Sequence, residues 1–505
     1  MSVLSIQRPA AAEVPSSLQE HFAAFREHTI GSRHLISTPY GRQPLLYADW
    51  TASGRLYEPI ERKMQETFGP YVSNPHTDSN TTGLTMTLAY QEARQIIRRH
   101  VNAGPADALL FCGNGTTGAV NKLLRIMGLK LPEWLTPEAV CPPEERPVIF
   151  VSHMEHHSNL LPWQEGIGDV VTVPSGAGGR VDLKQLEELL LRYRSRRFKI
   201  GSFTACSNVT GIETAYHQLA ALMHRHGGVC FVDFAASAPY AEINMHPASP
   251  LEKLDAVFFS PHKFLGGPGT GGVLLFDTAL CTGRLPDEPG GGTVVWVNRW
   301  GGRRYIDDIE VREDGGTPGF LQAIRTALCI RLKEQMNGPG QYMALREQEL
   351  CRRLLSGLAQ IPGCSVLEGA QSERHGIISF TMKELHYNLA VRLLNDRFGI
   401  QARGGCSCAG PYGHQLLGLG PEQSKAFIQA IQAGDQSLKP GWVRLSLHPI
   451  MTDREVEHML CAVRSIAAHH EEWAGDYSYN AATNSWLHAA ERGGTPEEIS
   501  RLFVL

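Results

Sequence analysis

Short apolar runs alternate with amphipathic helical stretches between about residue 45 and residue 330. The run "LLF" at 109–111 leads through a glycine turn into a stretch in which Val120, Leu123 and Leu124 fall on one helical face. Similar strand-like runs follow at 148–152, 198–205, 227–234, 255–260 and 271–276. Strands separated by helices are typical of a mostly parallel sheet covered by helices, so the pattern predicts one large α/β domain over 45–330.

The pattern of apolar and polar positions changes after residue 330, where longer helical stretches surround fewer strand-like runs, at 376–382 and 442–447. A capping box from Thr452 to Glu455 predicts the start of a helix. We therefore expect a smaller α+β domain over 331–475. Two terminal segments remain: 1–44, expected to pack with the small domain, and 476–505, too polar and Gly-interrupted for a core and expected to be a tail or an appended helix.

Composition limits the classes of partner. The 505 residues include 47 basic and 51 acidic side chains, which give no broad positive surface for nucleic acid or an anionic membrane. The first residues lack a cationic start followed by an apolar core, and no window is apolar enough for a membrane helix, so we expect a cytoplasmic protein. Eleven cysteines, many within apolar runs, favour free thiols in a reducing compartment.

Polar side chains follow neighbouring strands of the expected sheet. Asp233 ends the apolar run "VCFVD", Lys263 follows the next run, and a glycine turn precedes Thr116 at a helix N-terminus. The carboxyl ends of strands in open α/β sheets bind ligands, and free amides at a helix N-terminus suit phosphate. An amine for a Schiff base, a carboxylate for a ring nitrogen and a phosphate seat together indicate pyridoxal phosphate.

A second interpretation concerns the segment "HMEHH". His153, Glu155 and His156 are metal-ligand residue types at short spacing, so a zinc site is the alternative use of this segment. A zinc site also needs ordering partners and a further ligand, which the sequence does not identify. We therefore expect no metal.

Several of these stretches together resemble the class V aminotransferase family of fold-type I pyridoxal-phosphate enzymes. Within that family the chain is most similar to cysteine desulfurases and selenocysteine lyases, from "YADWTASG" near 47 to "VRLSLHP" near 449. The resemblance implies an aspartate aminotransferase-like large domain with a mostly parallel seven-stranded sheet, and a homodimer. The matching stretches are "GNGTTGAVN" (113–121), "HMEHHSNLLPW" (153–163), "CSNVTGIE" (206–213), "VDFAASAP" (232–239), "SPHKFLGGPGTGG" (260–272), "EDGGTP" (313–318) and "RGGCSCAGP" (403–411).

The resemblance also implies roles for individual residues. Lys263 would form the Schiff base, Asp233 would pair with the ring nitrogen, His156 would stack on the ring, and Asn208 would hydrogen-bond its hydroxyl. Where the family commonly has a Gln that touches this hydroxyl, the chain has Ala236. The phosphate would be held by Thr116, Thr117, Ser260 and His262, with Gly291 and Thr317 reaching in from the neighbouring subunit of a homodimer.

Two further segments concern the substrate. Cys408, the fifth residue after Arg403, matches the position of the family's sulfur nucleophile, and the surrounding glycines and proline favour an exposed loop. Cys406 leaves several interpretations open: relaying or protecting sulfur, cycling through a disulfide, ligating a metal with His414, or a structural role. Arg444 matches the family's carboxylate-binding Arg, and with Arg403 it is expected to bind substrate.

The predicted activity is conversion of L-cysteine to L-alanine, with the sulfur passed to Cys408 as a persulfide and then to a sulfur-acceptor protein. Another class V reaction on an amino acid is the alternative: β-elimination by a C–S lyase, selenocysteine lyase activity, amine transfer or epimerisation. A non-catalytic scaffold is the third. Residues 277–312 have no assigned counterpart in the family.

Overall fold

The computed structural model describes residues 17–371, 373–490 and 496–504. Its centre is a seven-stranded sheet in which five neighbouring strands run parallel, while β10 is antiparallel to both of its neighbours. The predicted mostly parallel, seven-stranded α/β architecture is confirmed. In spatial order the strands are β4 (Asp107–Cys112), β10 (Gly272–Asp277), β9 (Ala256–Phe259), β8 (Val229–Asp233), β7 (Lys199–Thr204), β5 (Val148–Ser152) and β6 (Asp169–Val173).

Helices cover both faces of this sheet, which explains why its strands are continuous apolar runs. Side chains of successive strand residues point to opposite faces: Phe258 packs in the cluster that contains Val120 of α4 (Gly115–Ile126). Phe259 packs in the other cluster, with Leu219 of α8 (Tyr216–Arg225). The remaining helices of this part are α2 (Glu58–Lys63), α3 (Thr81–His100), α5 (Pro137–Val140), α6 (Leu161–Gln164), α7 (Leu183–Arg192) and α9 (Ile309–Arg312).

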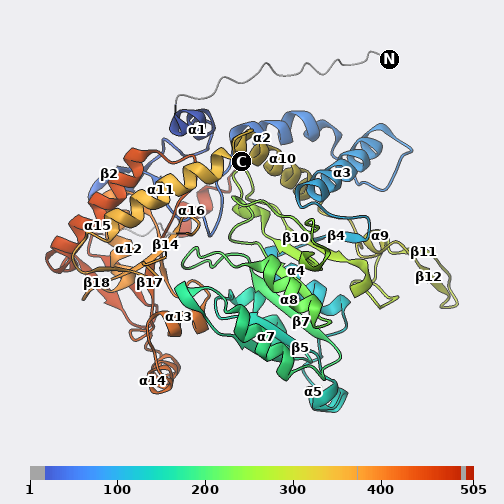
Figure 1. The fold of residues 1–505 in the computed structure, drawn as a ribbon. Coiled ribbons are helices and arrows are strands. Elements are labelled where there is room, and N and C mark those ends of the chain that lie inside the picture. The colour runs from blue at the N-terminus through green and yellow to red at the C-terminus, as the bar shows by residue number, and fades with distance from the viewer. Residues whose placement is uncertain (1–16, 372, 491–495, 505) are drawn as a thin grey trace.

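The C-terminal part is built on a second, four-stranded antiparallel sheet (Figure 1). Its strands are β13 (Cys364–Val366), β14 (Ile377–Met382), β17 (Trp442–Ser446) and β16 (Arg403–Gly405). The predicted capping box is present, because the Thr452 hydroxyl accepts from the Glu455 amide at 3.2 Å. The helix α10 (Phe320–Asn337) joins the two parts and packs against α3 of the large domain. The helices of the C-terminal part are α11 (Tyr342–Leu358), α12 (Tyr387–Phe398), α13 (Gly410–Leu416), α14 (Pro421–Gln432) and α15 (Asp453–Ala474).

The segment before the large domain contacts this C-terminal part. Arg26 of α1 (Leu18–Glu27) pairs with Glu455 of α15 at 2.7 Å, and the α1 side chain Phe22 is buried. A hairpin of β1 (Leu35–Thr38) and β2 (Gly41–Pro44) follows. Next, β3 (Leu46–Tyr47) pairs in parallel with β15 (Ile400–Gln401). The chain therefore enters the large domain along the edge of the small one.

The segment after 476 is more ordered than the expected polar tail. A β-hairpin of β18 (Tyr477–Asn480) and β19 (Ser485–His488) precedes α16 (Pro496–Arg501). The Tyr477 hydroxyl donates to Asp396 of α12 at 3.0 Å, and the Asn484 amide donates to the Tyr387 hydroxyl at 2.6 Å. Polar side chains thus fix the hairpin to α12, a packing that the expectation of a tail or an appended helix did not include.

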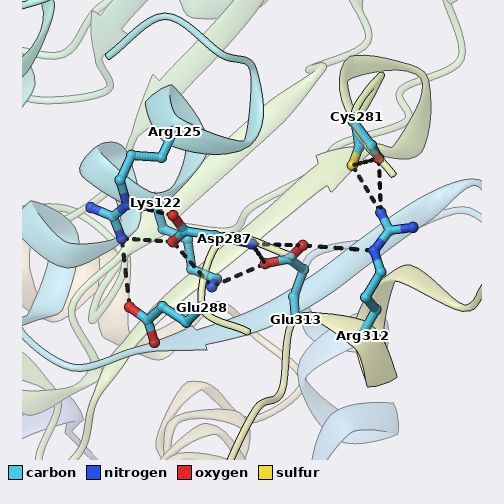
Figure 2. Close-up of polar contacts among 8 residues, drawn as sticks. Lys122, Arg125, Cys281, Asp287, Glu288, Arg312 and Glu313 are labelled. Atoms are coloured by element: carbon cyan, nitrogen blue, oxygen red, sulfur yellow. Dashed lines mark hydrogen bonds and ion pairs between the residues drawn. The ribbon is translucent and has the colours of Figure 1, made fainter. Parts of the chain in front are cut away.

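The segment between β10 and α10 contains a projection, on the side of the large domain away from the small domain (Figure 1). Its hairpin, β11 (Val294–Val297) and β12 (Arg303–Tyr305), carries Trp296 at 49% and Trp300 at 82% exposure. Figure 2 shows how the base of this projection is fixed to α4 by buried ion pairs. Asp287 lies between Arg125, at 2.7 Å, and Lys122, at 3.4 Å, and Glu313 pairs with Lys122 at 3.3 Å.

Within the ranges described above, no helix combines the length and the apolar character needed to cross a membrane.

Candidate active site

A cavity of about 280 Å³ opens at the carboxyl ends of the parallel strands, where the loops of the small domain meet the sheet. It brings together most of the residues expected from the sequence, although they come from segments far apart in the chain. Those that line it are Thr116, Thr117, His156, Asn208, Asp233, Ser260, His262, Lys263, Arg403, Cys408 and Arg444.

Lys263 ends a single helical turn directly after β9. Burial in the cavity is the main cause that lowers the pKa of its amine to about 8, while Asp233 opposes this shift and the cationic Arg444 adds to it. The loop approaches the backbone of Gly54 closely: a Cβ on Gly54 would lie 3.0 Å from the Lys263 carbonyl oxygen. The lowered pKa gives this amine a larger neutral fraction near neutral pH than an ordinary lysine has, as a nucleophile or base requires.

Asp233 is the last residue of β8 and is 3% exposed. Burial raises the pKa of its carboxyl to about 6, whereas the Ala235 amide, which donates at 2.8 Å, Lys263 and the Thr116 side chain favour the charged form. A buried carboxylate gains stability from a cationic partner. The protonated ring nitrogen of pyridoxal phosphate would be such a partner, so this side chain fits the cofactor.

The first turn of α4 forms the phosphate end of the cavity. Gly115 has a φ of +55°, and a Cβ there would lie 2.8 Å from the Ser260 hydroxyl. The Thr116 amide donates to that hydroxyl at 2.9 Å, and the Thr117 hydroxyl bonds Ser158 at 2.7 Å. Burial, followed by the charge of Lys263, lowers the pKa of His262 to about 4. Amides and hydroxyls at a helix N-terminus suit a phosphate dianion.

His156 is the expected stacking residue, and it follows a heavily hydrogen-bonded carboxylate. Burial lowers the pKa of His156 to about 3, so the ring is neutral, and its Nδ1 accepts from the Ser158 amide at 3.1 Å. Glu155 accepts from Asn159 at 2.7 Å and from the Thr204 amide at 2.9 Å. His153 bonds the Gly179 carbonyl at 3.1 Å. The three residues of the alternative zinc site therefore form hydrogen bonds with other protein groups in the described structure.

Asn208 lies between the expected ring position and the cysteine loop. Its side-chain nitrogen donates to the Ser407 carbonyl at 2.8 Å, and its backbone carbonyl accepts from Arg444 at 3.0 Å. Its Oδ1 is buried and has no hydrogen-bond partner among the described residues. Ala236, at the position of the family's Gln, packs instead against the thiol-bearing Cys206. A contact of Asn208 with a ring hydroxyl remains a prediction.

The loop that carries Cys408 is a tight turn from Cys406 to Ala409, closed by a 3.0 Å hydrogen bond from the Ala409 amide to the Cys406 carbonyl. Ser407 and Cys408 have φ values of +52° and +56°, the pair of left-handed residues that a type I′ turn requires. His157 fixes the turn: its amide donates to the Cys408 carbonyl at 2.8 Å. Cys408 is exposed and lines the cavity, whereas Cys406 is partly buried and does not line it.

Both expected substrate-binding arginines contact Asp49, a residue that the sequence had not singled out. Arg444 lies 3.0 Å from one carboxylate oxygen of Asp49, and Arg403 lies 2.8 Å from the other. Asp49 stands in the matched stretch "YADWTASG", so the signal was present. Its function was hidden because the two arginines lie in the small domain, hundreds of positions later in the chain.

Gly291 and Thr317 do not line this cavity in the described chain. Thr317 instead lines a neighbouring cavity of about 490 Å³, together with Asn114 and Thr117 at the start of α4. Its hydroxyl accepts from the Asn74 side chain at 3.2 Å. The expected contribution of Gly291 and Thr317 across a subunit interface stays a prediction.

Comparison with known proteins identifies relatives of this architecture. Probable cysteine desulfurases of Staphylococcus aureus and Halalkalibacterium halodurans are 28% and 29% identical to the chain, each over 73% of its length and over 84% and 85% of theirs. Among solved structures, a cysteine desulfurase of Thermococcus onnurineus NA1 matches with a TM-score of 0.70 at 23% identity, covering 91% of this chain and all of that one. A cysteine desulfurase of Escherichia coli matches with a TM-score of 0.66, also at 23% identity, over 89% of this chain and 98% of that one.

A family model matches the sequence of the chain itself, in addition to the likeness in fold to the solved structures. The model described as aminotransferase class-V matches residues 46–459, which include the large domain, the cysteine turn and Arg444. The chain therefore belongs to the class-V aminotransferase family, a family of pyridoxal-phosphate-dependent enzymes.

Proposed function

We propose that this protein is a cysteine desulfurase that converts L-cysteine to L-alanine and receives the sulfur on Cys408. The observation that carries the proposal is the shared cavity: an exposed thiol on a tight turn faces the same space as a buried amine and a buried carboxylate. The similarity to probable cysteine desulfurases supports the same reaction class.

The residues present fit pyridoxal phosphate. Asp233 would pair with the ring nitrogen, Lys263 would carry the covalent link, and the first turn of α4 with Ser260 and His262 would hold the phosphate. When bound, this cofactor supplies an electron sink that stabilises negative charge at the substrate α-carbon.

Each side chain then has a task in the desulfuration. Arg444 binds the substrate carboxylate, and Lys263, with its pKa lowered to about 8, takes the α-proton and returns it. The Cys408 thiolate attacks the substrate sulfur, so that a sulfur–sulfur bond forms while the substrate carbon–sulfur bond breaks. The released carbon fragment takes up a proton and leaves as L-alanine, which balances cysteine plus thiol against alanine plus persulfide.

The decisive experiment is incubation of the cofactor-loaded protein with L-cysteine, measuring alanine and sulfide with and without a thiol reductant. We expect alanine formation in the wild type and its near-complete loss in Cys408→Ala. Cys406→Ser is the matched control, because Cys406 stands two residues away but does not line the cavity. It should retain alanine formation.

Other products would redirect the proposal. Pyruvate with ammonia identifies a β-elimination lyase, and full alanine formation in Cys408→Ala removes the persulfide step. Loss of alanine formation in both cysteine variants would mean that the turn, rather than the Cys408 thiol, is what the reaction needs.

The exposed position of Cys408 also suits transfer of the sulfur to an acceptor protein. Mass spectrometry of the protein after L-cysteine treatment should find one additional sulfur on the peptide that contains Cys408. A cytoplasmic location remains a prediction from the sequence.

A further inference from the structure

The Asp49 carboxylate bridges two guanidinium groups from adjacent strands of the small domain. Arg444 of β17 donates to one of its oxygens at 3.0 Å, and Arg403 of β16 donates to the other through Nη2 at 2.8 Å and Nε at 3.0 Å. Asp49 is 9% exposed and Arg444 is 3% exposed. Burial of this charge-assisted pair fixes the guanidinium plane of Arg444, whereas Arg403, whose side chain is 52% exposed, is oriented by its two hydrogen bonds to Asp49.

The backbone around Asp49 is itself attached to β17. Asp49 forms a parallel bridge with Ser446, and the Ser446 amide donates to the Ala48 carbonyl at 2.7 Å. The Thr51 amide donates to the Ser446 hydroxyl at 3.0 Å. Because Ser446 follows Arg444 by two residues on the same strand, Asp49, Thr51 and Arg444 form one rigid wall.

Two polar atoms of this wall have no hydrogen-bond partner among the described residues. Arg444 uses Nη1 on the Asn208 carbonyl and Nη2 on Asp49, which leaves its buried Nε unused. The hydroxyl of Thr51, a residue that is 3% exposed, is likewise unused. Both residues line the cavity that contains Lys263. Buried donors without partners are costly, so unpaired donors on two residues that line a ligand cavity indicate a group that arrives with the ligand.

The charges of Asp49, Arg403 and Arg444 together favour an anion with a single charge. Two guanidinium groups face one carboxylate, so one positive charge of this trio is left uncompensated. A substrate α-carboxylate would compensate it, and its oxygens accept the kind of hydrogen bond that Nε and a hydroxyl can donate.

We propose that Asp49 is a positioning residue of the substrate carboxylate subsite and that Thr51 binds the carboxylate together with Arg444. Asp49 holds the two guanidinium groups in place from behind, and Arg444 Nε and the Thr51 hydroxyl donate to the substrate. This inference rests on the proposed function for the identity of the amino acid, but the subsite itself applies to any α-amino acid.

The test compares ligands that differ only in the carboxylate: L-cysteine with cysteamine for turnover, and L-alanine with ethylamine for binding, followed through the absorbance of the cofactor. In Asp49→Asn we expect the KM for L-cysteine and the Kd for L-alanine to rise about 10- to 100-fold. In Thr51→Val both should rise about three- to tenfold. The kcat for L-cysteine and all values for the two amines should change by less than about threefold in either variant.

Asp255→Asn is the matched control. Asp255 is also a buried carboxylate with two basic partners, His224 at 2.7 Å and Lys253 at 3.0 Å, but it precedes β9, at the end of the parallel strands opposite the cavity. We expect its variant to lose stability without distinguishing acids from amines. Asp49→Glu keeps the charge, so it should recover part of the affinity for L-alanine that Asp49→Asn loses. It should not recover any affinity that L-alanine and ethylamine lose equally.

Equal weakening of L-alanine and ethylamine binding in Asp49→Asn and Thr51→Val would overturn the inference, since it would indicate a general structural role. Unchanged binding of both ligands would overturn it as well. Failure of the proposed function is a separate result: a wild-type protein that forms no alanine from L-cysteine still reports on this subsite through the L-alanine and ethylamine pair.

Discussion

The two charged groups at the end of β8 and β9 are both shifted towards their neutral forms. Burial raises the pKa of Asp233 to about 6 and lowers the pKa of Lys263 to about 8, and their mutual attraction does not reverse either shift. Without the cofactor, each group therefore stays buried at some cost to stability. A cationic ring nitrogen beside Asp233 would remove this cost, which links the carboxylate to cofactor binding.

The Asp233 shift predicts a pH-dependent stability difference in the cofactor-free protein. The folded-state pKa of about 6 lies above the unfolded value of about 4, so the folded state binds more protons between these values and stability falls as pH rises through them. Asp233→Asn lacks this loss. We expect the variant to gain about 2 kcal/mol relative to wild type between pH 4.5 and pH 7.

Thermal midpoints of both cofactor-free proteins over this pH range measure the effect, because shifts in groups that do not interact with Asp233 cancel in the difference. A difference that stays constant with pH would mean that Asp233 is charged and well compensated throughout, contrary to its buried setting. A difference of the opposite sign would mean that its pKa is lowered by Lys263.

The sequence predicted the residues at the strand ends better than it predicted their partners. Asp233 and Lys263 follow successive parallel strands, and such strands bring their carboxyl ends to one edge, so the convergence of these residues follows from the apolar pattern. Asp49 precedes no long strand, and its partners Arg403 and Arg444 lie in the other domain. An ion pair between domains leaves no periodic signal in the sequence.

At the scale of single elements, the N-terminus of α4 depends on Gly115. Its φ of +55° is unfavourable for other residues, and an added Cβ would lie 2.8 Å from the Ser260 hydroxyl and 3.1 Å from the ring of His262. Gly115→Ala should therefore cost about 1–2 kcal/mol of stability through the backbone alone. We expect it in addition to weaken pyridoxal-phosphate binding, measured by absorbance titration, by about tenfold or more.

Gly128 at the other end of α4 provides the control. It has a φ of +69°, but nothing lies within 4 Å of an added Cβ there. Gly128→Ala should show a similar backbone cost and leave the cofactor affinity unchanged. Equal cofactor affinities in the two variants would contradict a phosphate seat at the first turn of α4.

Elements with strong apolar patterns were predicted, and those held by polar contacts were not. Six of the seven strands of the large sheet were predicted from their apolar runs, and the seventh, β6, which is mostly only partly buried, was not. The hairpin of β18 and β19, by contrast, alternates aromatic with polar residues. Its attachment to α12 depends on the hydroxyl of Tyr477 and the amide of Asn484. Such contacts form only once α12 is in place, so the segment reads as polar and unstructured when considered alone.

At the scale of the whole molecule, the hairpin of β11 and β12 exposes an unusually large apolar surface for a single chain. Val295, Trp296, Val297 and Trp300 are between 49% and 82% exposed, yet the base of the hairpin is held rigidly by the ion pairs of Figure 2. Large exposed apolar groups commonly mark contacts with another chain. This surface is consistent with the homodimer predicted from the sequence.

Sharing of active sites between two subunits can be tested by mixing inactive chains. Lys263→Ala lacks the amine, and Thr317→Trp should obstruct the site that Thr317 serves. If Thr317 serves the partner's cavity, a mixed dimer contains one site in which both residues are intact. Co-expression of the two differently tagged chains, followed by isolation of mixed dimers, should then restore about half of the wild-type activity.

The alternative to shared sites is that Thr317 acts within its own subunit. Thr317 lines a cavity with Asn114 and Thr117 of its own chain, next to the phosphate end of the active site. If Thr317 acts there within its own subunit, each site of the mixed dimer carries one defective residue and the mixed dimer stays inactive. Sedimentation of the wild type separates a third case: a monomer at working concentrations would exclude shared sites and leave the exposed Trp296 and Trp300 to a different partner.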